Sequence, residues 1–446
     1  MNAIEYFNFE HLNDLAEKEK IYYSPSVGWD KLSAKRINNN KIYFLKNIQK
    51  KILEGKYEFV PYKVNLLIKN KDSKPRKTCI PAVRDRIVIS AVKMYLYDVY
   101  NTVTFNIPAN NIVRKIIRII KEGKKKFYIK LDLKAFFDNI NHEILLNKIK
   151  EKIDDEIIID LVRKILENPQ KFDETDNRIK NVIGVPQGIS IATLLANIYM
   201  HDFDFKYSAR ENVDYFRYVD DIIIFAENEK TIYEILNEII YDLERKELLL
   251  INQEKTKSGN IEDGLEYLGY KLKKDSITIR QSSILKFERK IEGVFRNFSL
   301  ISKKDDREIK KFIWLLNVKI TGILVDQKKY GWLYYFSCIN DLTLLKKMDL
   351  LVLKYLKRFK LNNIIAQKEI KKFVKTYFEI NKNLNDSKYL LNLNNVSKEY
   401  KQKFLREICF VSDVEVLSDE ELDYRYKYNI YRTLKNLEKD IDSISG

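Results

Sequence analysis

Two adjacent aspartates, Asp220 and Asp221, stand between two runs of strand-forming residues in the segment 216–225. The aromatic, valine and isoleucine residues on either side favour a β-hairpin with both carboxylates at its turn. Carboxylate oxygens on a rigid turn are hard ligands of the kind that Mg²⁺ binds. An ordinary turn is the alternative, because aspartate also stabilises turns by bonding the local backbone.

A second run rich in strand formers, residues 127–138, carries Asp132. If its strand lies beside the hairpin, three carboxylates share one site. Nucleotidyl transfer needs little covalent chemistry from the protein; it needs two divalent ions about 3.5–4 Å apart that activate the attacking hydroxyl and stabilise the leaving group. Asp132, Asp220 and Asp221 are therefore candidate ligands of two Mg²⁺ ions, for which Mn²⁺ can substitute.

Further motifs surround these acids in a fixed order, and over residues 60–360 the chain resembles the reverse transcriptases. Tyr218 and the three residues after it are similar to the family's Tyr-x-Asp-Asp box, and Asp132 matches the first catalytic aspartate. Residues 184–190 are similar to the family's Pro-Gln-Gly loop, and residues 252–256 and 267–270 to two later palm motifs. Residues 76–88 are similar to the fingers of group II intron-like bacterial enzymes.

The resemblance implies an RNA-directed DNA polymerase and gives roles to single residues. Phe137 takes the place of the bulky residue beneath the incoming sugar, where a ring would exclude a 2′-hydroxyl. Phe136 is the better candidate for a core aromatic, because neighbouring residues of a strand face opposite ways. The Leu133 carbonyl would be a further metal ligand. Lys255 would approach the leaving pyrophosphate as a proton donor, and it follows a strand-like run, 248–251.

The substrate contacts are expected on two loops. In the polar turn 68–76, Arg76 is the main candidate for the triphosphate, because its planar guanidinium can bind two phosphate oxygens at once, with Lys69 or Lys74 as a helper. Gln187 and Gly188 would shape the nucleotide and template pocket, since glycine permits close backbone approach. Tyr218 completes the substrate-binding set. A solvated charged hairpin and an ordinary strand-to-helix turn are the respective alternatives.

The expected fold is α+β: a right-hand polymerase with fingers, a palm whose antiparallel sheet carries the catalytic acids, a helical thumb and an α-helical C-terminal extension. Apolar residues recur at helical spacing at positions 284, 287, 291, 294, 295 and 298, which predicts an amphipathic thumb helix. Further helices are expected at residues 87–100, near 312–320 and at 342–359. The predicted parts are an N-terminal helical segment, fingers, palm, thumb and C-terminal extension, at residues 1–60, 61–125, 126–280, 281–365 and 366–446.

Two aromatic-rich segments have a functional and a structural interpretation. Residues 329–336 combine aromatic with basic side chains, which is typical of base stacking; the alternative for this region is a helical bundle with a charged face. Four tyrosines near the C-terminus could offer a hydroxyl that primes synthesis, and their alternative is helix packing: Tyr424, Tyr426, Tyr428 and Tyr431.

Composition agrees with a polyanionic partner. The chain has 81 basic and 64 acidic residues and a net charge of +17, which attracts nucleic acid, although part of the lysine excess can reflect an AT-rich genome. Three cysteines and three histidines, without paired spacing, predict neither a zinc module nor disulfides. No apolar run reaches the ~20 residues of a membrane span, so we expect a cytoplasmic protein without membrane contact.

Within the family, the length and the helical tail look most like the unknown-group and abortive-infection enzymes of bacterial defence against phages. That resemblance implies a noncoding RNA as template, deoxynucleoside triphosphates as substrates and a DNA product, with a homo-oligomer or a partner defence protein as the assembly. Three alternatives stay open: a retron or group II intron-like enzyme, an RNA-binding protein of polymerase fold without turnover, and an RNA-synthesising polymerase, which Phe137 disfavours.

Overall fold

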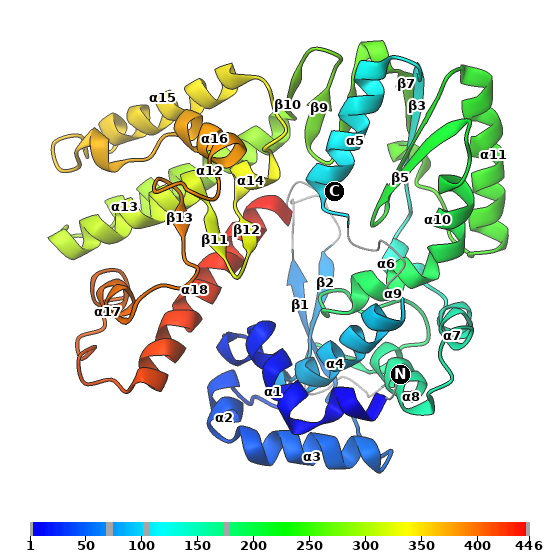
Figure 1. The fold of residues 1–446 in the computed structure, drawn as a ribbon, viewed down its shortest axis with the longest axis horizontal. Coiled ribbons are helices and arrows are strands. Elements are labelled where there is room, and N and C mark those ends of the chain that lie inside the picture. The colour runs from blue at the N-terminus through cyan, green and yellow to red at the C-terminus, as the bar shows by residue number, and fades with distance from the viewer. Residues whose placement is uncertain (1–2, 68–74, 101–106, 174–178, 443–446) are drawn as a thin grey trace. The chain divides into compact units, whose positions relative to one another are not determined.

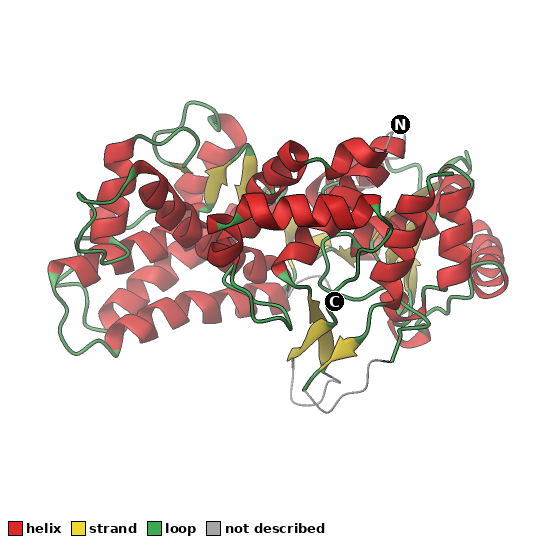
Figure 2. Ribbon diagram, turned by 90° about the horizontal axis from the view of Figure 1, so that it is seen from below, coloured by secondary structure: helices red, strands yellow, loops and turns green. Residues whose placement is uncertain are grey.

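The computed structural model describes residues 3–67, 75–100, 107–173 and 179–442 and confirms the α+β class. The chain forms two compact units, residues 1–107 with 125–259 and residues 108–124 with 260–446. Helix dominates both, and the strands gather in small sheets (Figure 2). No helix within the described ranges is both long and apolar enough to cross a membrane.

The first unit is built on helices that separate a small sheet from a larger one (Figure 1). The expected helical character of residues 1–60 and of the stretch after residue 87 is confirmed. Its α-helices are α1 (Phe9–Lys18), α2 (Ala34–Asn39), α3 (Lys41–Leu53), α4 (Val83–Val99), α6 (Phe136–Asn139), α7 (His142–Lys150), α8 (Glu156–Glu167), α9 (Ala192–Tyr199), α10 (His201–Ser208) and α11 (Glu229–Arg245).

The larger sheet of this unit has the strand order β5-β6-β3-β7. The central strand β6 (Asp221–Ala226) is buried from Ile222 onward on both faces, so both faces need cover. Helix α11 packs on β6 and β3, and α10 packs on β5 (Figure 1). The other strands are β5 (Val213–Tyr218), β3 (Phe127–Asp132) and β7 (Lys257–Asn260).

The smaller sheet has the order β2-β1-β4. Strands β1 (Tyr62–Leu67) and β2 (Arg76–Ile80) pair antiparallel, and β4 (Gln170–Lys171) adds to β1 in parallel. The two long strands are the expected arms of the hairpin around the polar turn. Helix α4 follows β2 directly and carries a buried acid, Asp85, which accepts hydrogen bonds from the Tyr57 hydroxyl and the Val60 amide.

The second unit is mainly helical. It contains α5 (Ala109–Glu122), α12 (Gln281–Ser299), α13 (Asp306–Thr321), α14 (Trp332–Tyr335), α15 (Leu342–Arg358), α16 (Phe373–Lys382), α17 (Lys398–Glu407) and α18 (Asp419–Asp442). Its strands form two small sheets, β8 (Leu265–Tyr267) with β9 (Tyr270–Leu272) and β10 (Ile277–Ile279), and β11 (Ile323–Val325) with β12 (Lys328–Tyr330) and β13 (Leu391–Asn392).

Apolar spacing predicted the inner face of α12 correctly. Five of the six apolar residues, Ile284, Phe287, Ile291, Phe295 and Phe298, are buried, whereas Val294 is half-buried. Rings at this spacing lie on one side of a helix, and here they meet rings of α13, α14 and α15. The helices expected near residues 312–320 and 342–359 are likewise confirmed.

The base-stacking interpretation is wrong for three of the five rings in residues 329–336, whereas Tyr330 and Tyr335 are half-buried. Trp332 and Phe336 are fully buried, and Tyr334 is 5% exposed. Trp332 lies flat on Phe287, with ring centroids 4.3 Å apart and planes 2° from parallel. These three rings are covered by protein and have no free face for a base, so they supply core volume.

The C-terminal helices share one hydrophobic core with α13 and β11. The cluster joins Val318, Ile323, Val325, Leu393, Phe404, Leu405, Val414, Leu422, Tyr426, Ile430, Leu434 and Leu437. Tyr426 is 5% exposed, and its hydroxyl is buried without a hydrogen-bond partner among the described atoms. The structure therefore contradicts Tyr426 as a priming residue; the other three tyrosines of that group are half-buried.

Candidate active site

The two adjacent aspartates lie where a hairpin was predicted. Strands β5 and β6 pair antiparallel with Tyr218 opposite Asp221, which leaves Val219 and Asp220 as the turn. Val219 has φ +58°, a left-handed conformation that a β-branched residue rarely adopts. Such a conformation costs about 1–3 kcal/mol and persists only where its surroundings enforce it.

Strand β3 brings the third acid beside this turn. In the β3–β6 register, Asp132 lies directly opposite Asp221. Opposite residues of an antiparallel pair share a face, with Cβ atoms about 5 Å apart. The Leu133 amide donates to the Asp220 carbonyl at 3.1 Å, so the chain after Asp132 is bonded to the turn itself. The structure thus places the three predicted acids together.

Two lysines neutralise two of these acids. Lys255 Nζ lies 3.1 Å from both carboxylate oxygens of Asp132, and Asn252 Nδ2 donates to one of them at 3.3 Å. Lys130 Nζ lies 3.1 Å from Asp221 Oδ1. Burial raises the pKa of the third acid, Asp220, and the charges of Asp221 and Asp132 raise it further.

The donors fit a hard divalent cation, although they do not form a closed cage. Within the described ranges, no three His, Cys, Asp or Glu side chains converge as a metal cluster. The carboxylates of Asp132 and Asp221 instead face lysines, and the charges of these two acids add to burial in raising the pKa of Asp220. Oxygen donors with excess negative charge are those that bind Mg²⁺. Asp132, Asp220, Asp221 and the Leu133 carbonyl are therefore the groups that could hold it.

Lys255 lies close to the acids, but the prediction of a strand before it is wrong. Residues 248–250 have no regular structure, and Ile251 forms only an isolated bridge with Leu133. Lys255 ends a short 3-10 helix, Gln253–Lys255, and its side chain is 52% exposed. The segment is held by the Asn252 amide, which donates to the Asp132 carbonyl at 2.7 Å.

The two adjacent phenylalanines follow β3 in the short helix α6, so the strand argument that separated them was wrong in its premise. The strand ends at Asp132, and Ala135 turns the chain with φ +47°. The outcome is nevertheless the predicted one for Phe136, which is 3% exposed, whereas Phe137 is half-buried. Phe137 also accepts a hydrogen bond at its carbonyl from the Val185 amide, 2.7 Å away.

The segment 184–190, which resembles the Pro-Gln-Gly loop, contacts both α6 and β2. The Gln187 carbonyl accepts from the Cys79 amide at 2.7 Å, and Gln187 Nε2 donates to Asp138 Oδ1 at 3.1 Å. Gly188 has φ +97°, and a Cβ there would lie 2.6 Å from Thr78 Cγ2. Glycine is required at this position because both the conformation and the close approach to β2 exclude a side chain.

The remaining predicted contacts are only partly described. Tyr218 is half-buried and ends β5. Arg76 begins β2, and only its backbone is described; Lys69 and Lys74 lie outside the described residues.

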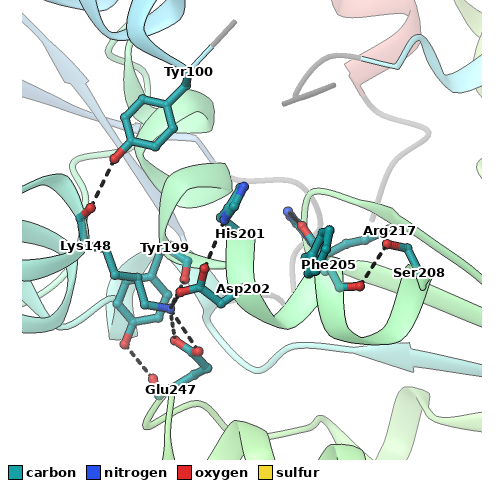
Figure 3. A network of polar contacts seen from close by, with 10 residues as sticks. Tyr100, Lys148, Tyr199, His201, Asp202, Phe205, Ser208, Arg217 and Glu247 are labelled. Atoms are coloured by element: carbon teal, nitrogen blue, oxygen red, sulfur yellow. Dashed lines mark hydrogen bonds and ion pairs between the residues drawn. The ribbon is translucent and has the colours of Figure 1, made fainter. Parts of the chain in front are cut away.

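A buried polar network, not anticipated from the sequence, supports the segment that carries Lys255 (Figure 3). Lys148 Nζ donates to both carboxylate oxygens of Glu247 at 2.9 Å and to the Tyr199 carbonyl at 2.6 Å. The Tyr199 hydroxyl donates to the Glu247 carbonyl at 2.5 Å. In this way α7 and α9 anchor the start of residues 247–255. Among so many lysines, nothing in the sequence marks Lys148 as one that pairs with a buried acid.

The sequence profile described as "Reverse transcriptase (RNA-dependent DNA polymerase)" matches residues 68–272. Among curated proteins, "Protein YkfC" of Escherichia coli K12 is 27% identical over 275 residues, which is 51% of this chain and 71% of that protein. "Group II intron-encoded protein LtrA" of Lactococcus lactis is 30% identical over 166 residues, or 36% of this chain and 27% of that protein. The chain thus spans about a quarter of that intron-encoded relative.

Solved structures of telomerase from Candida species are also similar. Apo telomerase from Candida tropicalis matches at a TM-score of 0.45 and 14% identity, covering 91% of this chain and 72% of that one. Telomerase from Candida albicans with a fragment of telomeric RNA matches at a TM-score of 0.43 and 16% identity, covering 92% and 65%.

Proposed function

We propose that this chain, in which residues 68–272 form a reverse transcriptase domain, is an RNA-directed DNA polymerase that acts by two-metal nucleotidyl transfer. The observation that carries the proposal is the register of β3 and β6. It sets Asp132 opposite Asp221, beside the turn that bears Asp220, inside the matched segment. Two divalent ions bound there would supply activation of the 3′-hydroxyl and charge neutralisation at the leaving pyrophosphate.

The proposed roles of the chain's own residues follow from their places. Phe137, half-buried in α6, excludes a ribose 2′-hydroxyl. Gln187 and Gly188 bound the nucleotide and template pocket. Lys255, already 3.1 Å from Asp132, needs only to leave that carboxylate in order to protonate a departing pyrophosphate.

Further assignments rest on the family resemblance. Lys69 and Arg76 bind the triphosphate, and Tyr218 lines the substrate site. The division into fingers, palm, thumb and extension at residues 60, 125, 280 and 365 is part of this proposal.

We also propose a dedicated noncoding RNA as template and a role in bacterial defence against phages. The support is the resemblance of the chain's length and helical tail to defence-associated enzymes, together with a net charge of +17 that favours RNA. A cytoplasmic location, and assembly with itself or with a defence partner, belong to the same proposal.

A second candidate is an RNA-binding protein of the same fold without turnover. The lysine pairs at Asp132 and Asp221 favour it, because a site neutralised from within has less need of metal ions. Separate supply of deoxyribonucleotides and ribonucleotides to the purified protein distinguishes the candidates. We expect incorporation of deoxyribonucleotides on an RNA template; tight RNA binding with incorporation of neither would favour the second candidate.

Sequencing of the nucleic acids that copurify with the protein tests the template. We expect one RNA species with complementary DNA from wild-type cells, and the same RNA without that DNA from cells carrying Asp220→Ala with Asp221→Ala. Heterogeneous RNA in both preparations would contradict a dedicated template.

A further inference from the structure

The turn that carries Asp220 is held in an unfavourable conformation, and the hairpin alone does not account for it. Two-residue hairpin loops favour asparagine and glycine, because those residues tolerate positive φ. This turn has Val219 at φ +58° instead. Some contact beyond the backbone pairing of the two strands must therefore keep the backbone of Val219 where it is.

Arg217 makes that contact. Its Nη1 donates to the Val219 carbonyl at 2.8 Å. The Leu133 amide donates to the next carbonyl, that of Asp220, at 3.1 Å. Consecutive carbonyls of the turn are thus bonded from two sides, one by a side chain of β5 and one by the residue that follows Asp132.

The guanidinium of Arg217 is itself fixed by two helices. Nε donates to Asp204 Oδ1 of α10 at 2.8 Å, Nη2 also contacts Asp204 Oδ2, and Nη2 donates to Asn197 Oδ1 of α9 at 3.2 Å. The Tyr215 hydroxyl donates to the same Asp204 oxygen at 2.6 Å. The Arg217 side chain is 6% exposed, so water does not replace these bonds.

We infer that Arg217 is a positioning residue, which, with Asp204 and Asn197, holds the strained turn so that Asp220 and Asp221 face Asp132. The planar guanidinium of Arg217 bonds three partners in fixed directions. A lysine has a single ammonium on a flexible chain and cannot bond all three in the same geometry. This role rests on the proposed function for its effect on synthesis, but its effect on the turn is independent of catalysis.

The test compares Arg217→Lys with the wild type in three measurements. Amide hydrogen exchange of peptides spanning residues 218–222 reports the turn, Mn²⁺ binding followed by electron paramagnetic resonance reports the acids, and single-nucleotide extension on a primed RNA template reports catalysis. We expect exchange to accelerate at least tenfold, Mn²⁺ to bind about tenfold more weakly, and kcat to fall about 100-fold, as a misplacement near 1 Å would cause, while KM for the nucleotide changes less than threefold.

Arg210→Lys is the matched control. Arg210 also pairs with an acid, Glu238 of α11, and is also partly buried. We expect it to leave all three measurements at wild-type values. If Arg217→Lys does not fold, as judged by circular dichroism, Asp204→Asn takes its place, because it keeps the arginine and removes the charge that orients it.

Wild-type exchange and wild-type Mn²⁺ binding in Arg217→Lys would overturn the inference. A wild-type protein that incorporates no nucleotide would instead overturn the proposed function, and the exchange and Mn²⁺ measurements would still decide the role of Arg217.

Discussion

The acid-bearing sheet of the first unit and the helical core of the second bury side chains for different purposes. Around the sheet, the side chains of Arg217 and Lys148, which are 6% and 14% exposed, each make several hydrogen bonds, and each bonds a segment that carries a candidate catalytic residue. In the helical core, the polar atoms of Trp332, Tyr334 and Tyr426 are buried without hydrogen-bond partners among the described atoms. An unpaired buried polar atom costs stability, which the area of a large ring offsets.

This difference distinguishes buried side chains that hold the candidate active site from those that fill the core. Around the sheet, the polar groups that make several directed bonds hold segments that carry candidate catalytic residues. Where large rings are buried with their polar atoms unpaired, they fill volume. Substitutions in the two regions should accordingly affect different measurements, activity in one and the free energy of unfolding in the other.

The largest effect is expected at the acidic turn. Asp220→Ala with Asp221→Ala should lower DNA synthesis at least about 1,000-fold, because the donors for the divalent ions are removed, and leave RNA affinity nearly unchanged. Primer extension and filter binding measure the two quantities. Asp214→Ala, on the same hairpin at the far end of β5, is the control and should keep full activity. An active double variant would contradict the assignment of the site.

Substitutions of buried rings in the helical core should lower the stability of the protein. Trp332→Ala removes a ring with no exposed surface and should lower the free energy of unfolding by about 3–5 kcal/mol, measured by denaturant titration. Phe378→Ala, at a ring that is 39% exposed on α16, should cost much less. RNA affinity of the folded Trp332→Ala protein should equal that of the wild type; a large loss of affinity without loss of stability would restore a base-stacking role.

A buried acid outside the site, Asp85, should affect the stability of the protein, and this effect should depend on pH. Burial raises the pKa of Asp85 to about 7, although Arg84 and the Tyr57 hydroxyl oppose the shift. The folded protein therefore binds the proton more tightly than the unfolded chain, so this contribution to stability is present at acid pH and is lost as pH rises through 7.

Asp85→Asn should remove that dependence. The difference in unfolding free energy between wild type and variant should change by on the order of 1–3 kcal/mol from pH 5 to pH 8, with the wild type losing stability relative to the variant. Urea titrations across that range measure it. A difference that stays constant with pH would show that Asp85 is ionised throughout.

The smallest expected effect is on sugar selectivity, and it should differ between the adjacent residues Phe136 and Phe137. Phe137→Val should reduce discrimination against ribonucleotides about tenfold, because the half-buried ring is proposed to meet the sugar. Phe136→Val, at the buried ring, should lower stability and leave sugar selectivity unchanged. Competing incorporation of both nucleotide types on one template gives the ratio. Equal selectivity in the Phe137 variant and the wild type would remove that residue from sugar selection.

Local patterns in the sequence predicted the elements on which the site depends. Runs of β-branched and aromatic residues predicted the hairpin with Asp220 at its turn, and helical spacing predicted the buried face of α12. The same local reasoning placed residues 136–137 and 248–251 in strands, and there it failed, because strand-forming side chains were used in a short helix and in a bonded but irregular segment.

Composition by itself misjudged the aromatic segment 329–336. A mixture of rings and cations is compatible with nucleic-acid stacking and with a core, and only burial tells them apart. The same holds for Lys148 and Arg217, which are two among 81 basic residues and differ from the others in their buried partners.

By itself, the sequence determined which acids could act together, since hard carboxylate ligands flanked by strand formers are a local property of residues 127–132 and 216–225. Only the tertiary structure decided their register, the lysines that face them and the arginine that bonds their turn. These contacts join residues far apart in the chain, from Asn197 to Val219 and from Asp132 to Lys255. Such pairings form only when separate helices and strands pack, and no local pattern of side chains specifies them.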